Sequence, residues 1–209
     1  GYNKEASEIK EFDWEVKENT LYIRGNCAME DWYPESKGTK PPWYEEKNIS
    51  KVIIEEGIEN IGTYAFYQCE NLIEIEIAQS VTSIGRNAFA ECNSLENIYI
   101  PDTVNSIGYR MFENCKNLKS VRLPNKAEIA SGVFEGCVSL QSINLPENMS
   151  VIGSYMFKGC ESLTNIVIPN GVTKIEDFAF SQCKSLTNIE IPDTVTYIGE
   201  YAFVGCPAI

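Results

Sequence analysis

The chain has 209 residues, a formal net charge of −13 and no histidine. The acidic balance argues against nucleic acid as a partner, because binding to phosphate relies on Lys and Arg. The absence of histidine removes the usual general base, the usual nitrogen ligand of a metal and every Ser-His or Cys-His catalytic pair. No apolar run approaches the length of about 18 residues needed to cross a bilayer, so we expect no membrane insertion in this segment.

The first 47 residues differ from the rest of the chain and hold all three tryptophans, Trp14, Trp32 and Trp43. Apolar residues alternate over residues 12–16 and 21–23 on either side of a short polar turn, which predicts a β-hairpin. We expect residues 1–47 to form an N-terminal cap that covers the open end of the structure that follows. The alternative is an aromatic platform on which sugars stack.

The rest of the chain, residues 48–209, is built from seven Phe-x-x-Cys units, spaced by 23 residues except for one step of 22. A period of this length predicts a solenoid, because a single unit of that size cannot bury its own apolar face and must stack on its neighbours. The units are Phe66/Cys69, Phe89/Cys92, Phe112/Cys115, Phe134/Cys137, Phe157/Cys160, Phe180/Cys183 and Phe203/Cys206.

Each repeat begins with a short strand, as residues 95–100 illustrate. Ile98 and Ile100 alternate with Tyr99, so the two isoleucines are expected to point inward and the tyrosine outward. Pro101 follows and ends the strand, since proline has no N–H to extend a ladder. Stacked strands of this kind predict a parallel β-sheet along one face of the solenoid.

A bend and a second apolar segment complete the repeat. Gly108 is expected to allow a tight bend. Apolar residues then recur at helix-like spacing over residues 110–118, which predicts a short helix or turn on the opposite face. Ala130 takes the place of the bend glycine in the fourth repeat, which is also one residue short, and Glu176 takes it in the sixth. We expect irregular bends at these two positions.

The repeat resembles the BspA-like class of bacterial leucine-rich repeats, whose units follow the pattern Ile-Pro-x-x-Val-x-x-Ile-Gly-x-x-Ala-Phe-x-x-Cys-x-x-Leu. Residues 77–95 and 191–206 match it nearly position for position, and the match covers about three quarters of the chain. Residues 21–32 and 41–62 are similar to the amino-terminal cap of that family. The resemblance implies a curved right-handed leucine-rich-repeat coil that acts as a binding or adhesion module on the cell surface or in secreted form.

Eight cysteines would suggest disulfides in an exported protein. Cysteines at one repeat position point in parallel, which is poor geometry for a disulfide and cannot converge on a zinc ion. We therefore predict that the seven repeat cysteines are buried free thiols. Cys27, alone in the cap, has no partner in the sequence pattern.

The best candidate for paired catalytic carboxylates is Glu74 with Glu76, about 7 Å apart on the same face of one strand. That separation invites comparison with a glycosidase. An open sheet face, however, offers neither the burial that raises the pKa of one carboxyl nor a pocket that distorts a sugar. We expect no catalytic, cofactor or metal site in this chain.

The candidate ligand-binding residues are those that point outward between the inward apolar positions of each strand. At about 4.8 Å per strand they would form a row about 30 Å long, and curved solenoids use such strips for binding. We call this set the outer row: Ile53, Glu76, Tyr99, Arg122, Asn144, Val167 and Glu190.

The sequence leaves two functions open. The first is a binding or adhesion module that contacts a host extracellular protein or glycan through the outer row, and the second is a structural spacer within a larger surface protein. We expect the export signal to have been removed before Gly1. Ile209 lies where an eighth repeat would begin, so the uncapped C-terminal end predicts either further chain or weak self-association.

Overall fold

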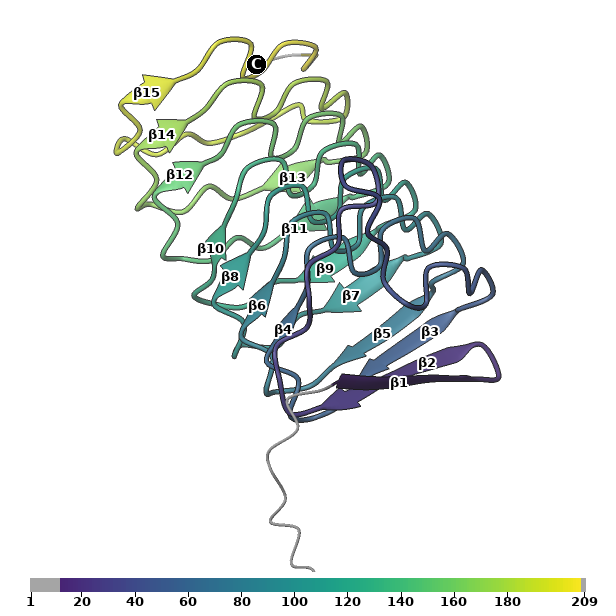
Figure 1. Ribbon diagram of the computed structural model, residues 1–209. Coiled ribbons are helices and arrows are strands. Elements are labelled where there is room, and N and C mark those ends of the chain that lie inside the picture. Colours follow the sequence, from purple (N-terminus) through teal and green to yellow (C-terminus); the bar gives the residue numbers. More distant parts are fainter. Residues whose placement is uncertain (1–11, 208–209) are drawn as a thin grey trace, which may run out of the picture.

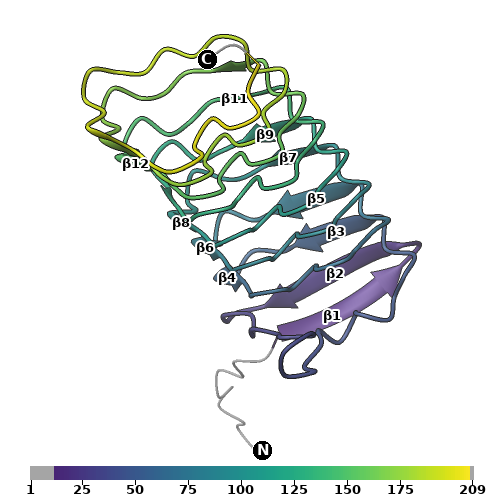
Figure 2. The same ribbon diagram turned by 90° about the horizontal axis from the view of Figure 1, so that it is seen from above.

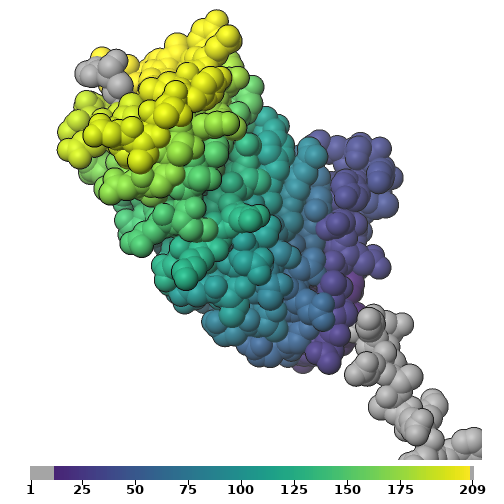
Figure 3. Space-filling model, turned by 90° about the vertical axis from the view of Figure 1, so that its left-hand side faces the viewer, coloured from purple at the N-terminus to yellow at the C-terminus, as the bar shows by residue number. Residues whose placement is uncertain are grey.

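The computed structural model describes residues 12–207, which wind into a coil whose successive turns stack along one axis (Figures 1 and 2). In the space-filling view the repeats form bands that follow one another from the cap to the C-terminal end (Figure 3). The leucine-rich-repeat solenoid expected from the sequence is confirmed. The proposed boundary between residues 47 and 48 stays a prediction.

The cap begins with an antiparallel hairpin of β1 (Phe12–Lys17) and β2 (Thr20–Gly25). Strand β2 then pairs in parallel with β3 (Lys51–Ile54), the first strand of the solenoid. The hairpin therefore covers a strand edge that would otherwise have unpaired backbone groups, which is what a cap must do.

The cap also supplies the first ring of the core. Trp43 is 1% exposed and stacks on Phe66 with ring centroids 5.7 Å apart. Its indole Nε1 donates a hydrogen bond to the carbonyl of Ala65 over 2.8 Å. Trp32 is buried as well, so the alternative of a sugar-stacking platform is wrong for these two tryptophans, whose rings are inaccessible.

The first ladder of parallel strands lies where the sequence predicts it. In register, Ile53 lies opposite Glu76 and Tyr99 opposite Arg122, with apolar partners between them facing inward. After β3, its strands are β5 (Glu74–Ile77), β7 (Asn97–Tyr99), β9 (Ser120–Arg122), β11 (Ser142–Ile143) and β13 (Asn165–Ile166).

A second ladder of parallel strands, which the sequence analysis did not predict, forms from the Val-x-x-Ile segment that follows each corner. Its strands are short and pair isoleucine to isoleucine, as in Ile84 with Ile107. They are β4 (Asn60–Ile61), β6 (Ser83–Ile84), β8 (Ser106–Ile107), β10 (Glu128–Ile129), β12 (Val151–Ile152), β14 (Lys174–Ile175) and β15 (Tyr197–Ile198).

The third side of the coil consists of tight turns, and no helix occurs within residues 12–207, so the helix half of the prediction is wrong. Two residues per repeat adopt left-handed backbone conformations, as Arg110 (φ 53°) and Asn114 (φ 57°) do in the third. These residues break the right-handed path that a helix needs. The N–H of Phe112 instead donates to the carbonyl of Val133 in the next repeat over 2.9 Å.

A column of stacked aromatic rings runs through the core on this third side. From Trp43 to Phe203, neighbouring centroids lie 5.3–5.9 Å apart and the ring planes differ by 3–22°. Phenylalanine recurs in every repeat because each ring packs against the ring of the next repeat. The column thus links the cap to the last repeat.

The bend glycine occurs for a different reason from the tight bend that we expected. Gly108 does not have a positive φ. A Cβ atom there would lie 2.5 Å from the backbone nitrogen of Arg86 in the preceding repeat. Glycine at residue 108 therefore serves the close approach of successive coils, whereas the fourth and sixth repeats accommodate the Cβ atoms of Ala130 and Glu176 at the same corner.

Both substituted bends keep the ladder bond to the preceding repeat, so neither bend is irregular on that side. The N–H of Glu176 donates to the carbonyl of Ile152 over 2.9 Å, and that of Ala130 donates to the carbonyl of Ile107 over 3.0 Å. Between the fourth and fifth repeats, however, neither β9 and β11 nor β10 and β12 are paired. Across this junction, which we call the seam, backbone hydrogen bonds remain on the turn side, from residues 132, 134 and 136, and the N–H of Ser162 donates to the carbonyl of Val138 over 3.2 Å.

The last repeat presents apolar side chains at the open end of the coil, where Figure 3 shows its atoms. Tyr197, Ile198, Tyr201 and Val204 are exposed there. Ile209 lies outside the described residues, and self-association through this end stays a prediction.

None of residues 12–207 forms a helix that could cross a bilayer.

Candidate binding surface

The outer row lies on one face of the first ladder, as the sequence predicts, but its members differ in accessibility. Ile53 and Arg122 are half-buried, whereas the other five are exposed, with Val167 reaching 82%. Glu190 belongs to the seventh repeat, in which residues 187–191 form no regular strand.

In the first two repeats the outer row is occupied by an ion-pair cluster. The ammonium group of Lys51 contacts the carboxylates of both Glu74, at 3.1 Å, and Glu76. The two glutamates raise the pKa of Lys51 through these hydrogen bonds. The carboxylates considered for glycosidase chemistry are therefore exposed and share one cation, which matches a solvated surface pair.

In the third and fourth repeats the outer row forms a second cluster. Arg122 holds both carboxylate oxygens of Asp102, at 2.7 and 2.8 Å, and its guanidinium lies 5.0 Å from the centroid of the Tyr99 ring. The hydrogen bonds from Arg122 hold the pKa of Asp102 below its usual range. Arg122 is fixed in place by these contacts and has few donors left for a ligand.

From the fourth repeat onward, the outer row lines three adjoining grooves. The first has a volume of about 900 Å³ and is lined by Arg122 and Asn144 across the seam. The second, about 640 Å³, shares Asn144 and Val167 with its neighbours, and the third, about 610 Å³, extends to Glu190. Because they share lining residues, they form one surface, which we call the sheet-face groove.

A model of the BspA-type leucine-rich repeat region, in six copies, matches residues 41–163 and 127–209. The chain belongs to this family. A search of curated protein sequences gave no match.

Solved structures of bacterial repeat proteins share the fold of this BspA-type chain. The leucine-rich repeat protein of T. pallidum is 25% identical, with a TM-score of 0.67 over 91% of this chain and 95% of its own. A leucine-rich repeat protein of Bacteroides ovatus is 22% identical, with a TM-score of 0.51 over 95% of this chain and 79% of its own. The pneumococcal vaccine antigen PcpA is 16% identical, with a TM-score of 0.57 over 93% of this chain and 65% of its own.

The six cysteines of this BspA-type array from Cys92 to Cys206 each contact the preceding repeat. Cys115, for example, donates its S–H to the carbonyl of Phe89 over 3.0 Å, and burial raises the pKa of its thiol to about 12. All eight cysteines are free thiols, as predicted for the seven of the repeats. Cys69 and Cys206 are only half-buried because they lie in the first and last repeats, which corrects the expectation that all seven are buried.

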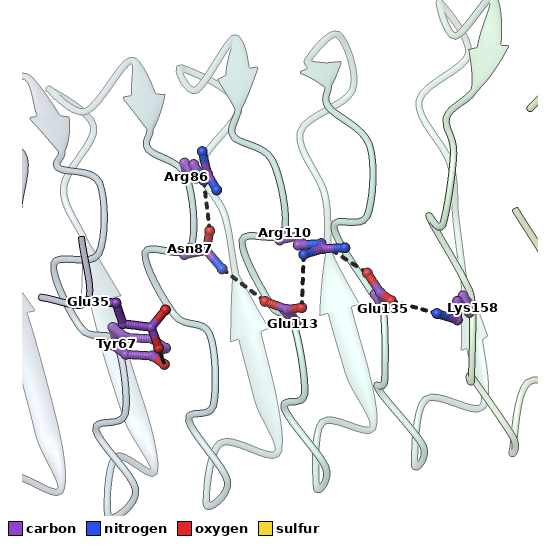
Figure 4. A network of polar contacts seen from close by, with 8 residues as sticks. All are labelled: Glu35, Tyr67, Arg86, Asn87, Arg110, Glu113, Glu135 and Lys158. Carbon is purple, nitrogen blue, oxygen red and sulfur yellow. Dashed lines mark hydrogen bonds and ion pairs between the residues drawn. The ribbon is translucent and has the colours of Figure 1, made fainter. Parts of the chain in front are cut away.

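A network of polar side-chain contacts on the turn side was not predicted from the sequence (Figure 4). Asn87 donates to Glu113 over 3.1 Å, and Arg110 lies between Glu113 and Glu135 at 3.5 and 3.0 Å. Lys158 donates to Glu135 over 3.2 Å and so crosses the seam. Burial raises the pKa of Glu113 despite the neighbouring arginine. These charges bind one another, which favours a structural role for this BspA-type turn face.

Sequence reasoning also missed the corner residues that form one wall of the sheet-face groove. Glu147, Asn170 and Asp193 lie just after the corner prolines and line the groove beside the outer row. Their signal in the sequence is their position one or two residues beyond each proline. Ile53, Glu76 and Tyr99 belong to the outer row but do not line the groove.

Proposed function

We propose that this chain is a non-catalytic binding module that recognises a host protein or glycan through the sheet-face groove. The observation that carries the proposal is that four outer-row residues from consecutive repeats, Arg122, Asn144, Val167 and Glu190, line adjoining grooves. Extended concave surfaces of this kind are the usual binding surfaces of solenoids. Membership of the BspA-type family supports a location on the bacterial cell surface or in secreted form.

The lack of histidine and the arrangement of the acidic groups support a non-catalytic role. The exposed Glu74 and Glu76 share Lys51, and the repeat thiols are buried with raised pKa values. A reactive thiol needs the opposite environment, one that lowers its pKa. Recognition without chemistry is therefore the function that this surface supports best.

The test is a binding screen against purified extracellular-matrix proteins and host glycans, run with a variant that obstructs the groove. Val167→Trp places a large ring in the groove at a position that is 82% exposed, so we expect folding to be unaffected. Ile73→Trp is the matched control, since Ile73 is 59% exposed outside the groove.

A partner that binds the wild type and the Ile73→Trp control, and binds Val167→Trp at least ten-fold more weakly, would support the proposal. Equal binding by both variants would remove the groove from the function. If the wild type binds no partner at all, the spacer alternative replaces the binding module.

A further inference from the structure

Three carboxylates of the sheet-face groove form no ion pair within residues 12–207, although one of them, Glu147, also lines the first section together with Lys126. Glu147, Glu190 and Asp193 line its second and third sections and form no ion pair within the described residues. This differs from the other end of the outer row, where Lys51 neutralises Glu76 and Arg122 neutralises Asp102. Among the described outer-row and groove-lining residues, the carboxylates without an ion pair thus all lie in the groove.

The uncharged residues that line the second and third sections of the same groove are apolar or carry amides. Leu145 and Ile168 line the second section together with the exposed side chain of Val167. The amides Asn144 and Asn170 line the same section. An aliphatic lining with amides suits a polypeptide, whose backbone can hydrogen bond to the amides while its side chains cover the apolar atoms.

The lining of the groove disfavours the other classes of polymer. Its three sections contain no Phe, Tyr or Trp among their lining residues, so no ring is available to stack on a sugar. Lys126 lies at the fourth-repeat end of the groove. In the sections over the fifth to seventh repeats, all charged lining residues are acidic. Anionic polymers would be repelled there, and cations would be attracted.

We infer that the sheet-face groove takes an extended polypeptide whose Lys or Arg side chains lie against Glu147, Glu190 and Asp193. The inference rests on the proposed function and names the class of partner. Four neighbouring repeats span about 14 Å, which accommodates about four residues of an extended chain. The basic residues lie toward the seventh repeat, away from Lys126.

The experiment uses an octapeptide of alternating Lys and Thr, with alternating Glu and Thr and a neutral hexamer of N-acetylglucosamine as comparison ligands. The groove variant is Glu147→Gln/Glu190→Gln/Asp193→Asn. The control variant is Glu59→Gln/Glu128→Gln/Glu200→Gln, which removes the same charge from exposed glutamates that do not line the groove. Affinities are measured by calorimetry at two salt concentrations.

We expect the Lys-Thr peptide to bind the wild type, to lose at least ten-fold in affinity for the groove variant and to lose less than two-fold for the control. Higher salt should weaken binding, since the exposed charges are screened. An equal loss in both variants would mean non-specific attraction to an acidic protein and would overturn the inference, as would failure of the peptide to bind.

The comparison ligands separate this inference from the proposed function. If the sugar hexamer binds and Val167→Trp abolishes its binding, the groove is a recognition site but its partner is a glycan, so only the inference fails. If neither peptide nor sugar binds, and the screen finds no partner sensitive to Val167→Trp, both fail.

Discussion

At the scale of single residues, glycine has two different functions in this repeat. Gly159 lies in a turn with φ +76°, and a Cβ there would meet Gly136 at an ordinary 3.6 Å. Gly108 has no positive φ, but a Cβ there would lie 2.5 Å from the backbone of the preceding repeat. One position therefore needs glycine for its conformation and the other for space.

We expect the two alanine substitutions to differ in cost for this reason. Gly159→Ala should lower the free energy of unfolding by about 1 kcal/mol, the cost of a left-handed alanine. Gly108→Ala should lower it by about 3 kcal/mol, because overpacking forces two backbone segments apart. Urea denaturation of both variants beside the wild type measures the difference, and equal costs would show that close approach is not what selects Gly108.

At the scale of elements, the seam sets the fourth and fifth repeats apart from the other junctions. Every other junction between repeats retains at least one of the two ladders, whereas the seam has neither among the described strands. The fourth repeat lacks the residue that corresponds to Asn105, and its bend glycine is replaced by Ala130. Strand β10 pairs in register with β8 but does not pair with β12.

The seam predicts a minimum of amide protection in the middle of the array. A uniform solenoid should exchange most slowly at its centre, because its ends fray. We expect residues 142–152 to exchange faster than residues 165–175, as measured by hydrogen exchange with mass spectrometry.

A variant that restores the missing residue tests the cause. Inserting Asn after Ala127 together with Ala130→Gly should slow exchange at residues 142–152, since it restores the register of the ladder. The same insertion after Val172, in a repeat of normal length, is the control and should not slow exchange. Slow exchange throughout the wild-type centre would contradict the assignment of the seam.

At the scale of the whole molecule, the aromatic column couples the repeats. Phe157 is fully buried and stacks on Phe134 at 5.6 Å and on Phe180 at 5.3 Å, so its removal leaves a cavity bounded by two repeats. Tyr99 is 55% exposed and contacts solvent on the sheet face. The core of this protein is thus a line along the axis rather than a central cluster.

We expect Phe157→Ala to lower the free energy of unfolding by about 3–5 kcal/mol, and Tyr99→Ala to lower it by less than about 1 kcal/mol. Chemical denaturation followed by circular dichroism gives both values. Because the repeats unfold together only while their interfaces hold, the Phe157 variant should also show a broader transition. The reverse ranking of the two variants would show that the inward and outward assignments are wrong.

The sequence by itself determined the period, the first ladder and the inward positions of Phe112 and its equivalents, because each follows from a local pattern repeated seven times. The hairpin of the cap followed from apolar residues that alternate on either side of a polar turn. The turn conformation was also signalled, since glycine occupies the left-handed position at Gly136, Gly159 and Gly205. The Phe-x-x-Cys spacing nevertheless suited a helix equally well. Only the hydrogen bonds to the next repeat distinguish the tight turn from a helix.

The tertiary structure alone decided the second ladder, the seam and the sheet-face groove. Each depends on how one repeat lies against the next. The spacing of residues along the chain does not specify how neighbouring repeats contact each other. Arg122 illustrates the point, because its sequence position marked it as a binding residue while its contacts with Asp102 and the carbonyl of Ile100 use three of its five donors. Glu147 and Asp193 became candidates only when the stacking of the coils placed them beside the outer row.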